Sequence, residues 1–234
     1  MNERAWISLT NPFPGLRSFG PGDSHLFFGR TLNSEEVINR LMQNRLVSVI
    51  GASGSGKSSL VLSGVIPRLL SANADGRKSW SFLVLRPNSN PVESLATELS
   101  TLSAAAGFAY VSPQEALNSL QAGKEGLADI VNRIRKNLRQ QVVLVIDQFE
   151  DLFRFSDDPF RGNVRDTVSD FISLIIEAAR QEETGLYIIL TMQSDYIQEC
   201  ARYEGLIALM NTGSYLIPQI KGEGYEELIE EPLR

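Results

Sequence analysis

A glycine-rich segment followed by a lysine and a serine is the strongest sign of chemistry in this sequence. It reads Gly51-Ala-Ser-Gly-Ser-Gly56-Lys57-Ser58 and fits the complete pattern of a phosphate-binding loop, with a strand predicted before it and a helix after it. The glycines let backbone N–H groups turn inward, and the helix start adds partial positive charge opposite a triphosphate. A flexible Gly/Ser connection would explain the glycines but not the Lys-Ser pair. The predicted nucleotide-binding residues are Gly51, Ser53, Gly54, Ser55, Gly56, Lys57, Ser58 and Ser59.

Two side chains of this loop have expected partners. Lys57 is predicted to reach the β and γ phosphates, and the hydroxyl of Ser58 to bind magnesium. A second magnesium partner should follow a neighbouring buried strand, and the apolar run 142–146 is followed directly by Asp147. Ligands of open α/β sheets bind at the carboxyl edge of the strands, so Asp147 is expected to meet the loop there. Alone, Asp147 would more simply cap a helix, but beside a phosphate loop the magnesium role is favoured.

A second acidic residue lies just beyond this strand. Glu150 is the best candidate to polarise a hydrolytic water, which requires hydrogen-bond reach of that water. In many phosphate-loop ATPases the catalytic glutamate directly follows the magnesium aspartate, and Gln148 occupies that place here. Hydrolysis is therefore a weaker expectation than binding. The alternative is that Glu150 and Asp151 only stabilise the first turn of a helix.

Two further groups of residues are candidates for nucleotide contacts. Thr191, Gln193 and Asp195 follow an apolar strand and could contact the γ-phosphate, although Asp195 could equally cap the next helix. The box Phe27-Phe28-Gly29-Arg30, some twenty residues before the loop, could wrap over the base of the nucleotide, with Arg30 in contact. An aromatic pair is more often core packing, so both interpretations stay open.

The elements that must position these residues follow from hydrophobic periodicity. Five short apolar runs predict strands and three periodic stretches predict helices, with mixed helical segments from about 91 to 138. Apolar strands alternating with helices predict an α/β fold, a three-layer α/β/α sandwich around a mostly parallel five-stranded sheet. Ser34 is expected to cap the first helix and Pro67 to kink or end the second. The predicted strands are 46–50, 81–85, 142–146, 186–191 and 215–217, and the predicted helices are 34–41, 58–70, 164–180 and an acidic one from near Glu223.

Composition limits the class of protein. The chain has 234 residues, 22 basic and 28 acidic side chains, a formal net charge of −6 and 43% hydrophobic residues, which predicts an ordered globular domain. One cysteine, Cys200, and one histidine, His25, cannot form a disulfide framework or a zinc cluster. The acidic balance disfavours a nucleic-acid partner. Neither a secretion signal nor an apolar run near the roughly 20 residues of a membrane helix is present, so the expected compartment is the cytoplasm.

The whole pattern resembles the STAND class of signalling P-loop NTPases, and specifically the family described as novel STAND NTPase 1. The resemblance covers nearly the whole chain, and few families combine its N-terminal lead-in with an Asp-Gln-Phe-Glu box. The matching features occur in family order: the lead-in 11–19, the Phe27–Arg30 box, the loop 51–59, the Leu-rich helix ending near Pro67, Arg86-Pro87, the Asp147–Glu150 box and the segment 195–200.

This resemblance implies an ATP-dependent switch of the AAA-like, additional-strand type. It implies ATP and Mg²⁺ as ligands and slow turnover. In such proteins the NTPase module sits between an effector and a sensor made of repeats, often WD40 repeats, and nucleotide exchange or homo-oligomerisation couples them. The preference for ATP over GTP rests largely on the resemblance, because no guanine-reading motif is evident.

Two features depart from the family pattern. Gln193 stands where the family usually has Arg, which weakens the expectation of γ-phosphate sensing at that position. The family continues into a winged-helix segment and often into repeats, whereas this sequence stops at Arg234, so it is expected to be a fragment or a stand-alone core. The expected division is a lead-in with the base-proximal box (1–33), the NTPase core (34–218) and the start of the winged-helix segment (219–234).

Three other functions remain open. A small-molecule or nucleic-acid kinase would need a substrate pocket and usually an Arg-rich lid, for which Arg133, Arg135 and Arg139 are candidates, although such faces are usually just solvated. Gln148 and Gln193 suggest a nucleotide-binding interaction scaffold without useful catalysis. A DNA-associated AAA-like loader is disfavoured by the acidic balance.

Overall fold

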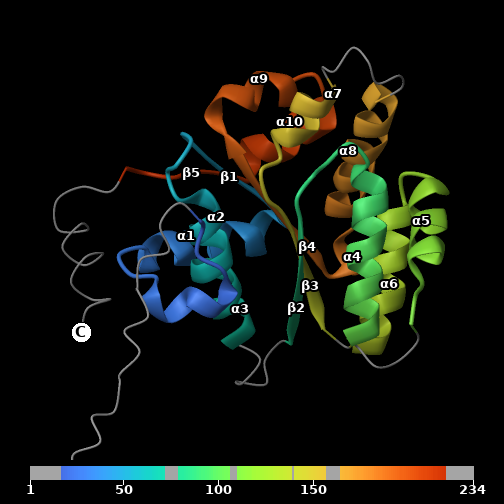
Figure 1. Cartoon of the computed structure of the whole chain (residues 1–234), viewed down its shortest axis with the longest axis horizontal. Helices are drawn as coiled ribbons and strands as arrows, with labels where there is room; N and C mark the ends of the chain where they lie inside the picture. Colours follow the sequence, from blue (N-terminus) through green and yellow to red (C-terminus); the bar gives the residue numbers. More distant parts are fainter. Residues whose placement is uncertain (1–16, 72–78, 106–109, 139, 157–163, 220–234) are drawn as a thin grey trace, which may run out of the picture.

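The computed structural model describes residues 17–71, 79–105, 110–138, 140–156 and 164–219 (Figure 1). Residues 11–16 of the lead-in, Arg139 and the acidic helix expected from near Glu223 lie outside these ranges. Within them, five strands form one sheet in the order β2-β3-β4-β1-β5, and every neighbouring pair is parallel. The strands are β1 (Leu46–Gly51), β2 (Trp80–Leu85), β3 (Gln141–Ile146), β4 (Leu186–Gln193) and β5 (Ser214–Leu216).

The strand order confirms the predicted additional-strand arrangement. β4 lies between β1, which leads into the phosphate loop, and β3, which leads to Asp147. All three strands end at the same carboxyl edge because they are parallel. The loop and the aspartate are therefore brought together across the end of β4. β4 is also two residues longer than predicted, since Met192 and Gln193 pair with the end of β1.

Helices cover both faces of the sheet, which confirms the three-layer sandwich. In Figure 1, α4, α6 and α8 lie on one side of the strands with α5 outside them, and the other side is covered by α1 (Thr31–Asn44), α2 (Lys57–Ser59) and α3 (Ile66–Ser71). Successive strand residues alternate between the two cores: Leu144 packs toward α4–α8, whereas Val143 and Val145 pack toward α1–α3. The helices on the first side are α4 (Pro91–Ala105), α5 (Pro113–Gln121), α6 (Gly126–Leu138) and α8 (Val164–Arg180).

The remaining helical segments connect the strands or precede α1. They are η1 (Pro21–Leu26), α7 (Asp151–Ser156), η4 (Ser194–Tyr196), α9 (Ile197–Cys200) and α10 (Glu204–Thr212), with η3 (Glu182–Thr184) before β4. Over the ranges that the structure describes, no helix has both the length and the apolar character needed to cross a bilayer.

The first helix starts earlier than predicted, and the second continues past Pro67. α1 runs over Thr31–Asn44 with Arg30 as its N-cap, so Ser34 is not the cap. The Ser34 hydroxyl instead donates to the carbonyl oxygen of Arg30 one turn earlier, a bond that lets serine sit inside a helix. The helix after the loop does not end at Pro67 but continues to Ser71.

The irregularity in that helix precedes the proline. It begins as α2 (Lys57–Ser59), widens into a π-helical segment, η2 (Leu60–Val65), and continues as α3 (Ile66–Ser71). Proline has no N–H to donate to the preceding turn, and a wider turn accommodates that loss without ending the helix. The sequence therefore predicted the extent of this helix but not its geometry.

Candidate functional site

The phosphate loop is open to solvent at the carboxyl edge of β1. Gly54 and Gly56 have φ values of +72° and +86°, a region that suits glycine. At Gly51 a Cβ would lie 2.3 Å from Cγ2 of Ile217, so the residue after β5 can pack against the base of the loop only because position 51 is glycine. Ala52, Ser53, Gly54 and Gly56 are exposed, so packed side chains do not seal the loop.

Lys57 points into this loop. Its ammonium group donates to the carbonyl oxygens of Ala52 at 2.7 Å and Gly51 at 3.0 Å, and the residue is only 8% exposed. Burial lowers the pKa of Lys57, while the charges of Glu150 and Asp147 act in the opposite direction. An anion in the loop would offer this ammonium a stronger partner than the neutral carbonyls it now contacts.

One polar atom of the loop lacks a partner within the described residues. The hydroxyl oxygen of Ser55 is buried and makes no hydrogen bond, which is a costly state for a buried polar group. A phosphate oxygen in the loop would provide an acceptor. The residues of the loop therefore fit a polyphosphate.

Asp147 is the centre of a hydrogen-bonded cluster. The aspartate is 1% exposed, and its Oδ1 accepts from the Ser58 hydroxyl at 2.6 Å and from the Thr191 hydroxyl at 2.7 Å. Its Oδ2 accepts from Nη2 and Nε of Arg86 at 3.0 and 3.2 Å. The structure thus brings together Ser58 and Asp147, the two residues predicted to hold magnesium, and these oxygen donors suit that ion.

Arg86 is the part of this cluster that reasoning from the residues did not assign. A signal for it existed, because Arg86 follows β2 directly, and Leu85 at the end of β2 is in register with Ile146 before Asp147. Residues that follow two parallel neighbours in register emerge side by side at the carboxyl edge. A basic residue at this position therefore meets the carboxylate that follows β3.

Thr191 supports the turn after β3. Besides donating to Asp147, its hydroxyl accepts from the backbone N–H of Gln148 at 2.9 Å. Gln148 has a φ of +60°, a conformation that non-glycine residues adopt only when their surroundings enforce it. Thr191 therefore fixes the carboxylate of Asp147 and the backbone of Gln148.

Replacing Thr191 with valine should lower the free energy of unfolding by about 1–3 kcal/mol, because buried Asp147 loses a donor and the part-buried N–H of Gln148 loses its acceptor. Urea denaturation of the variant measures this change through its midpoint at unchanged slope. Thr191→Ser keeps the hydroxyl and should retain most of the stability. Equal losses in the two variants would mean that methyl packing, rather than the hydrogen bonds, explains the role of Thr191.

Glu150 is buried beside this cluster. The residue is 2% exposed, and its Oε2 accepts from the backbone N–H of Gln193 at 3.4 Å. Its carbonyl oxygen accepts from the N–H of Phe153 in the first turn of α7. Glu150 therefore begins a helix, as one interpretation expected, while its side chain faces the end of β4.

Asp195 does not act as the expected helix cap. It lies inside η4 and is exposed, and its carboxylate accepts from the Ser194 hydroxyl at 3.3 Å. The N-cap residues of η4 and α9 are Gln193 and Tyr196, and neither cap has a side-chain hydrogen bond. A short carboxylate displaced from the cap position cannot reach the free N–H groups.

The lead-in is attached to the helix that follows the loop. The backbone N–H of Phe19 donates to the Ser59 hydroxyl at 3.1 Å, and the Ser63 hydroxyl donates to the carbonyl oxygen of Gly20 at 2.6 Å. These two bonds fix residues 19–20 on the first turns of that helix. Ser59, predicted to bind nucleotide, therefore also anchors the lead-in.

The Phe27–Arg30 box packs against the same helix. Phe27 joins the core on the α1–α3 side and meets the Phe19 ring edge to face, with centroids 6.0 Å apart. At Gly64 a Cβ would lie 2.9 Å from Phe27, so this glycine permits the close approach. Buried Arg30 donates to the carbonyl oxygen of Pro218 at 2.9 Å, linking α1 to the segment after β5. Phe27 thus has the core role, and contact of Arg30 with the nucleotide stays a prediction.

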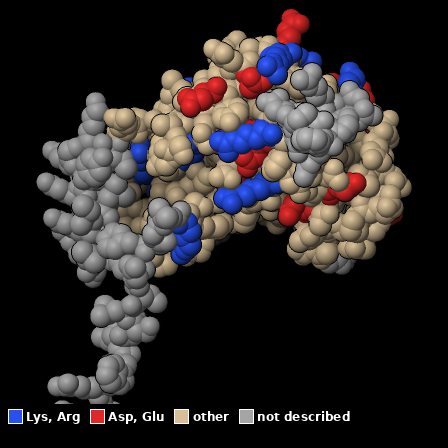
Figure 2. All heavy atoms as spheres, turned by 45° about the horizontal axis from the view of Figure 1, so that its top comes forward, with Lys and Arg blue, Asp and Glu red and all other residues tan. Residues whose placement is uncertain are grey.

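Charged side chains gather on the face that carries the carboxyl edge. Figure 2, which turns this edge toward the viewer, shows Lys and Arg side chains on both sides of acidic ones near the centre of the face. The chain carries a net charge of −6, so such a local basic contribution is needed to hold a polyphosphate.

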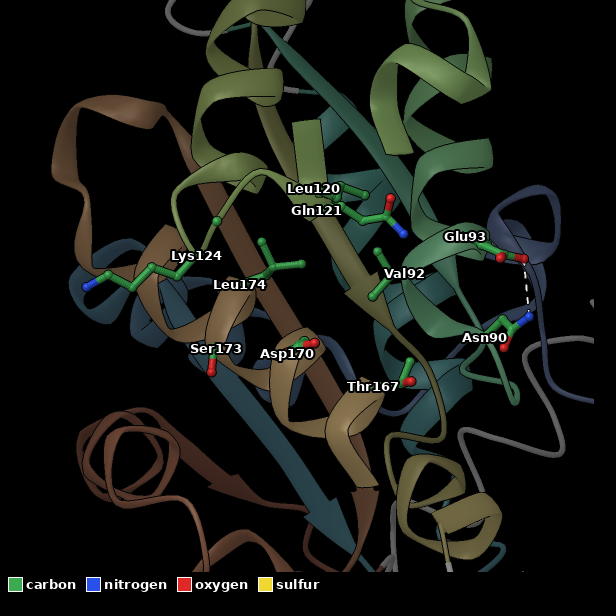
Figure 3. Close-up of a pocket in the computed structure, with 11 residues that line it drawn as sticks. Asn90, Val92, Glu93, Leu120, Gln121, Lys124, Thr167, Asp170, Ser173 and Leu174 are labelled. Atoms are coloured by element: carbon green, nitrogen blue, oxygen red, sulfur yellow. Dashed lines mark hydrogen bonds between the residues drawn. The ribbon is translucent and has the colours of Figure 1, made fainter. Parts of the chain in front are cut away.

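A separate cavity of about 550 Å³ lies between the start of α4, the α5–α6 connection and α8 (Figure 3). Its lining is mixed, with Val92 and Leu174 among polar side chains such as Glu93, which accepts from Asn90. None of the lining residues belongs to the phosphate loop or to the Asp147 cluster. This cavity is therefore distinct from the candidate nucleotide site.

The basic face of α6 does not lie over the loop. Arg135 donates to the carbonyl oxygen of Glu183, which precedes β4 and thus lies at the amino edge of the sheet. Arg133 forms an ion pair with Glu115 at 3.6 Å. These two arginines are therefore at the wrong edge to form a lid over the phosphate loop.

Two solved structures share this fold. The Walker-type ATPase PABY2304 of Pyrococcus abyssi is similar with a TM-score of 0.56 and 17% identity, over 92% of this chain and 60% of that one. The ORC2 protein of Aeropyrum pernix, solved as ADPNP-ADP complexes, is similar with a TM-score of 0.54 and 14% identity, over 87% and 51%. This chain thus spans half to three fifths of the lengths of those proteins. No curated protein matched the sequence.

The family assignment comes from a sequence model. The model of the family described as Novel STAND NTPase 1 matches residues 12–234, which includes the phosphate loop, Asp147 and the end of β4. The parallel sheet with its inserted strand agrees with the P-loop fold that the sequence predicted. The chain belongs to the novel STAND NTPase 1 family.

Proposed function

We propose that this chain is an ATP-binding, magnesium-dependent switch module that hydrolyses ATP slowly. The observation that carries the proposal is the meeting of Lys57, Ser58 and Asp147 at an open glycine-rich loop. An ammonium group, main-chain amides and two oxygen donors for a cation are the parts that polyphosphate binding needs. The ADPNP and ADP of the ORC2 structure support adenine nucleotides as the ligand class.

Each residue has a defined part in this proposal. The loop amides and Lys57 bind the phosphates, Ser58 and Asp147 hold the cation, and Thr191 fixes the orientation of Asp147. Bound magnesium supplies positive charge that stabilises the charge developing on the phosphates. Glu150 is the proposed base that orients the hydrolytic water. Its burial and its bond to the backbone of β4 agree with slow turnover.

The switch part of the proposal rests on linkage between the site and its neighbours. A ligand shifts a conformational equilibrium only by its differential affinity for the two states. Two contacts would transmit the presence of nucleotide to the rest of the protein. One joins the lead-in to Ser59, and the other joins Arg30 to the segment after β5. The proposed partners are effector and sensor domains or proteins of the family's kind, with nucleotide-dependent self-association in the cytoplasm.

The test is direct titration. Fluorescently labelled ATP and GTP are titrated onto the wild-type chain with and without Mg²⁺, and phosphate release is followed in parallel. We expect magnesium-dependent binding of ATP in preference to GTP, with slow release of phosphate. Absence of nucleotide binding under both conditions would overturn the proposal, and rapid transfer to an added acceptor would favour the kinase instead.

Replacing Glu150 with glutamine should separate binding from hydrolysis. The amide keeps the size and can still accept from the Gln193 N–H, but it cannot act as a base, so phosphate release should fall about 100-fold. The affinity for ATP should change by less than about threefold, because no phosphate contact is lost.

A scaffold without useful catalysis is the second candidate, favoured by the 2% exposure of Glu150. It predicts equal and near-background phosphate release from the wild type and the Glu150→Gln variant, with ATP binding retained in both.

A further inference from the structure

We infer that Arg86 is a ligand of the terminal phosphate, held beside the site by Asp147 until ATP enters. The inference rests on the proposed function and adds a residue to it. Arg86 donates through Nη2 and Nε to Oδ2 of Asp147, whose other oxygen contacts Ser58. The carboxylate of Asp147 therefore bridges Arg86 and Ser58, the proposed metal ligand in the phosphate loop.

The two partners of this ion pair differ in exposure. The side chain of Asp147 is 1% exposed, whereas that of Arg86 is 58% exposed. The guanidinium thus covers the carboxylate from the solvent side, the side on which the loop is also open. An exposed arginine at the end of a strand can turn through its side-chain torsions alone, so it can change partners without moving the sheet.

Charge gives the reason for the exchange. A buried carboxylate without a cation is costly, and Arg86 meets that need while the site holds no metal. With a divalent cation held by Ser58 and Asp147, the same carboxylate would be neutralised and would hold the guanidinium less strongly. The terminal phosphate then offers oxygens that match the arginine fork in geometry and charge.

The neutral residue at the end of β4 strengthens this assignment. Gln193 carries no charge, and its backbone N–H is directed to Glu150. β4 therefore supplies no positive charge to the phosphates at that position. Arg86, at the end of β2, supplies a guanidinium to the same edge of the sheet from the other side of Asp147.

The test compares ATP with ADP, which lacks the terminal phosphate. Affinities for both are measured with Mg²⁺ for the wild type, Arg86→Ala and Arg86→Lys. We expect Arg86→Ala to lose about 10- to 100-fold in ATP affinity and less than about threefold in ADP affinity. Arg86→Lys keeps the positive charge but loses the two-pronged guanidinium, so its ATP affinity should lie between those of the wild type and Arg86→Ala. Arg202→Ala, which removes an exposed arginine paired with Glu199, is the matched control and should change neither affinity.

The outcomes separate this inference from others. If Arg86 only neutralises Asp147, its removal changes the ATP and ADP affinities equally, and the inference is wrong. If Arg86→Ala does not fold, the ratio of ATP affinity to ADP affinity in Arg86→Lys is the test: a ratio below that of the wild type supports the inference, and an unchanged ratio contradicts it. If the wild type binds neither nucleotide, the proposed function fails first. If the wild type binds ATP and both Arg86 variants keep its ATP-to-ADP ratio, the inference alone fails.

Discussion

Replacing Lys57 with alanine should lower the affinity for ATP about 1,000-fold, since charge-assisted hydrogen bonds to two phosphates are lost together. In the free chain its ammonium group rests on the carbonyl oxygens of Gly51 and Ala52 and lies near Glu150 and Asp147. The lysine is thus the main positive charge inside the loop. Isothermal titration calorimetry with Mg²⁺ and ATP measures the loss.

The matched control for this variant is Lys124→Ala. Lys124 lies in the connection between α5 and α6, is 61% exposed and pairs with Glu177 of α8. It carries the same formal charge as Lys57 without any contact with the phosphate loop. Its removal should leave ATP affinity unchanged within about twofold. An equal loss in both variants would point to net charge rather than to a phosphate contact, and an unchanged affinity in Lys57→Ala would exclude the loop as the site.

Replacing Asp147 with asparagine should lower phosphate release about 1,000-fold and abolish the effect of Mg²⁺ on ATP affinity. An amide oxygen can still accept from Ser58 and Thr191, so these two hydrogen bonds are preserved, whereas the amide nitrogen cannot accept from Arg86. The negative charge that attracts both the cation and Arg86 is lost. ATP titrations in Mg²⁺ and in EDTA, with single-turnover phosphate release, test both parts of the prediction.

Asp170→Asn on the exposed face of α8 is the matched control for Asp147→Asn. It removes the same charge from the chain at a residue that lines the separate cavity rather than the Asp147 cluster. Its phosphate release and its response to Mg²⁺ should equal those of the wild type. A response to Mg²⁺ retained in Asp147→Asn would mean that the ion is held without this carboxylate.

The strands and their parallel direction could be predicted because both follow from short-range patterns, whereas the additional-strand order was implied by the family resemblance. The apolar run 142–146 is buried on both faces, so it reads as continuous hydrophobicity followed by an aspartate. The loop 51–58 carries its chemistry in adjacent residues. Parallel strands then bring the two segments to one edge, which is why the meeting of Ser58 and Asp147 followed from the sequence.

Other features depend on contacts between distant segments, which no local pattern encodes. The ion pair of Arg86 with Asp147 joins residues 61 positions apart. The bond of Phe19 to Ser59 spans 40 positions. The close approach of Phe27 and Ser34 to Gly64 likewise joins distant segments, and this packing was not predicted. Local propensity yields to such tertiary packing.

The lead-in bonds to Ser59 and Ser63 also determine how the chain can be shortened. A version that starts at Thr31 would leave both hydroxyls without their present partners and would remove the aromatic ring that fills the space above Gly64. The damage would fall on the helical turns that carry Lys57 and Ser58. A shortened protein for crystallisation should therefore keep the chain from Arg17 onward, because Phe19, Gly20 and Phe27 stabilise the helix that carries Lys57 and Ser58.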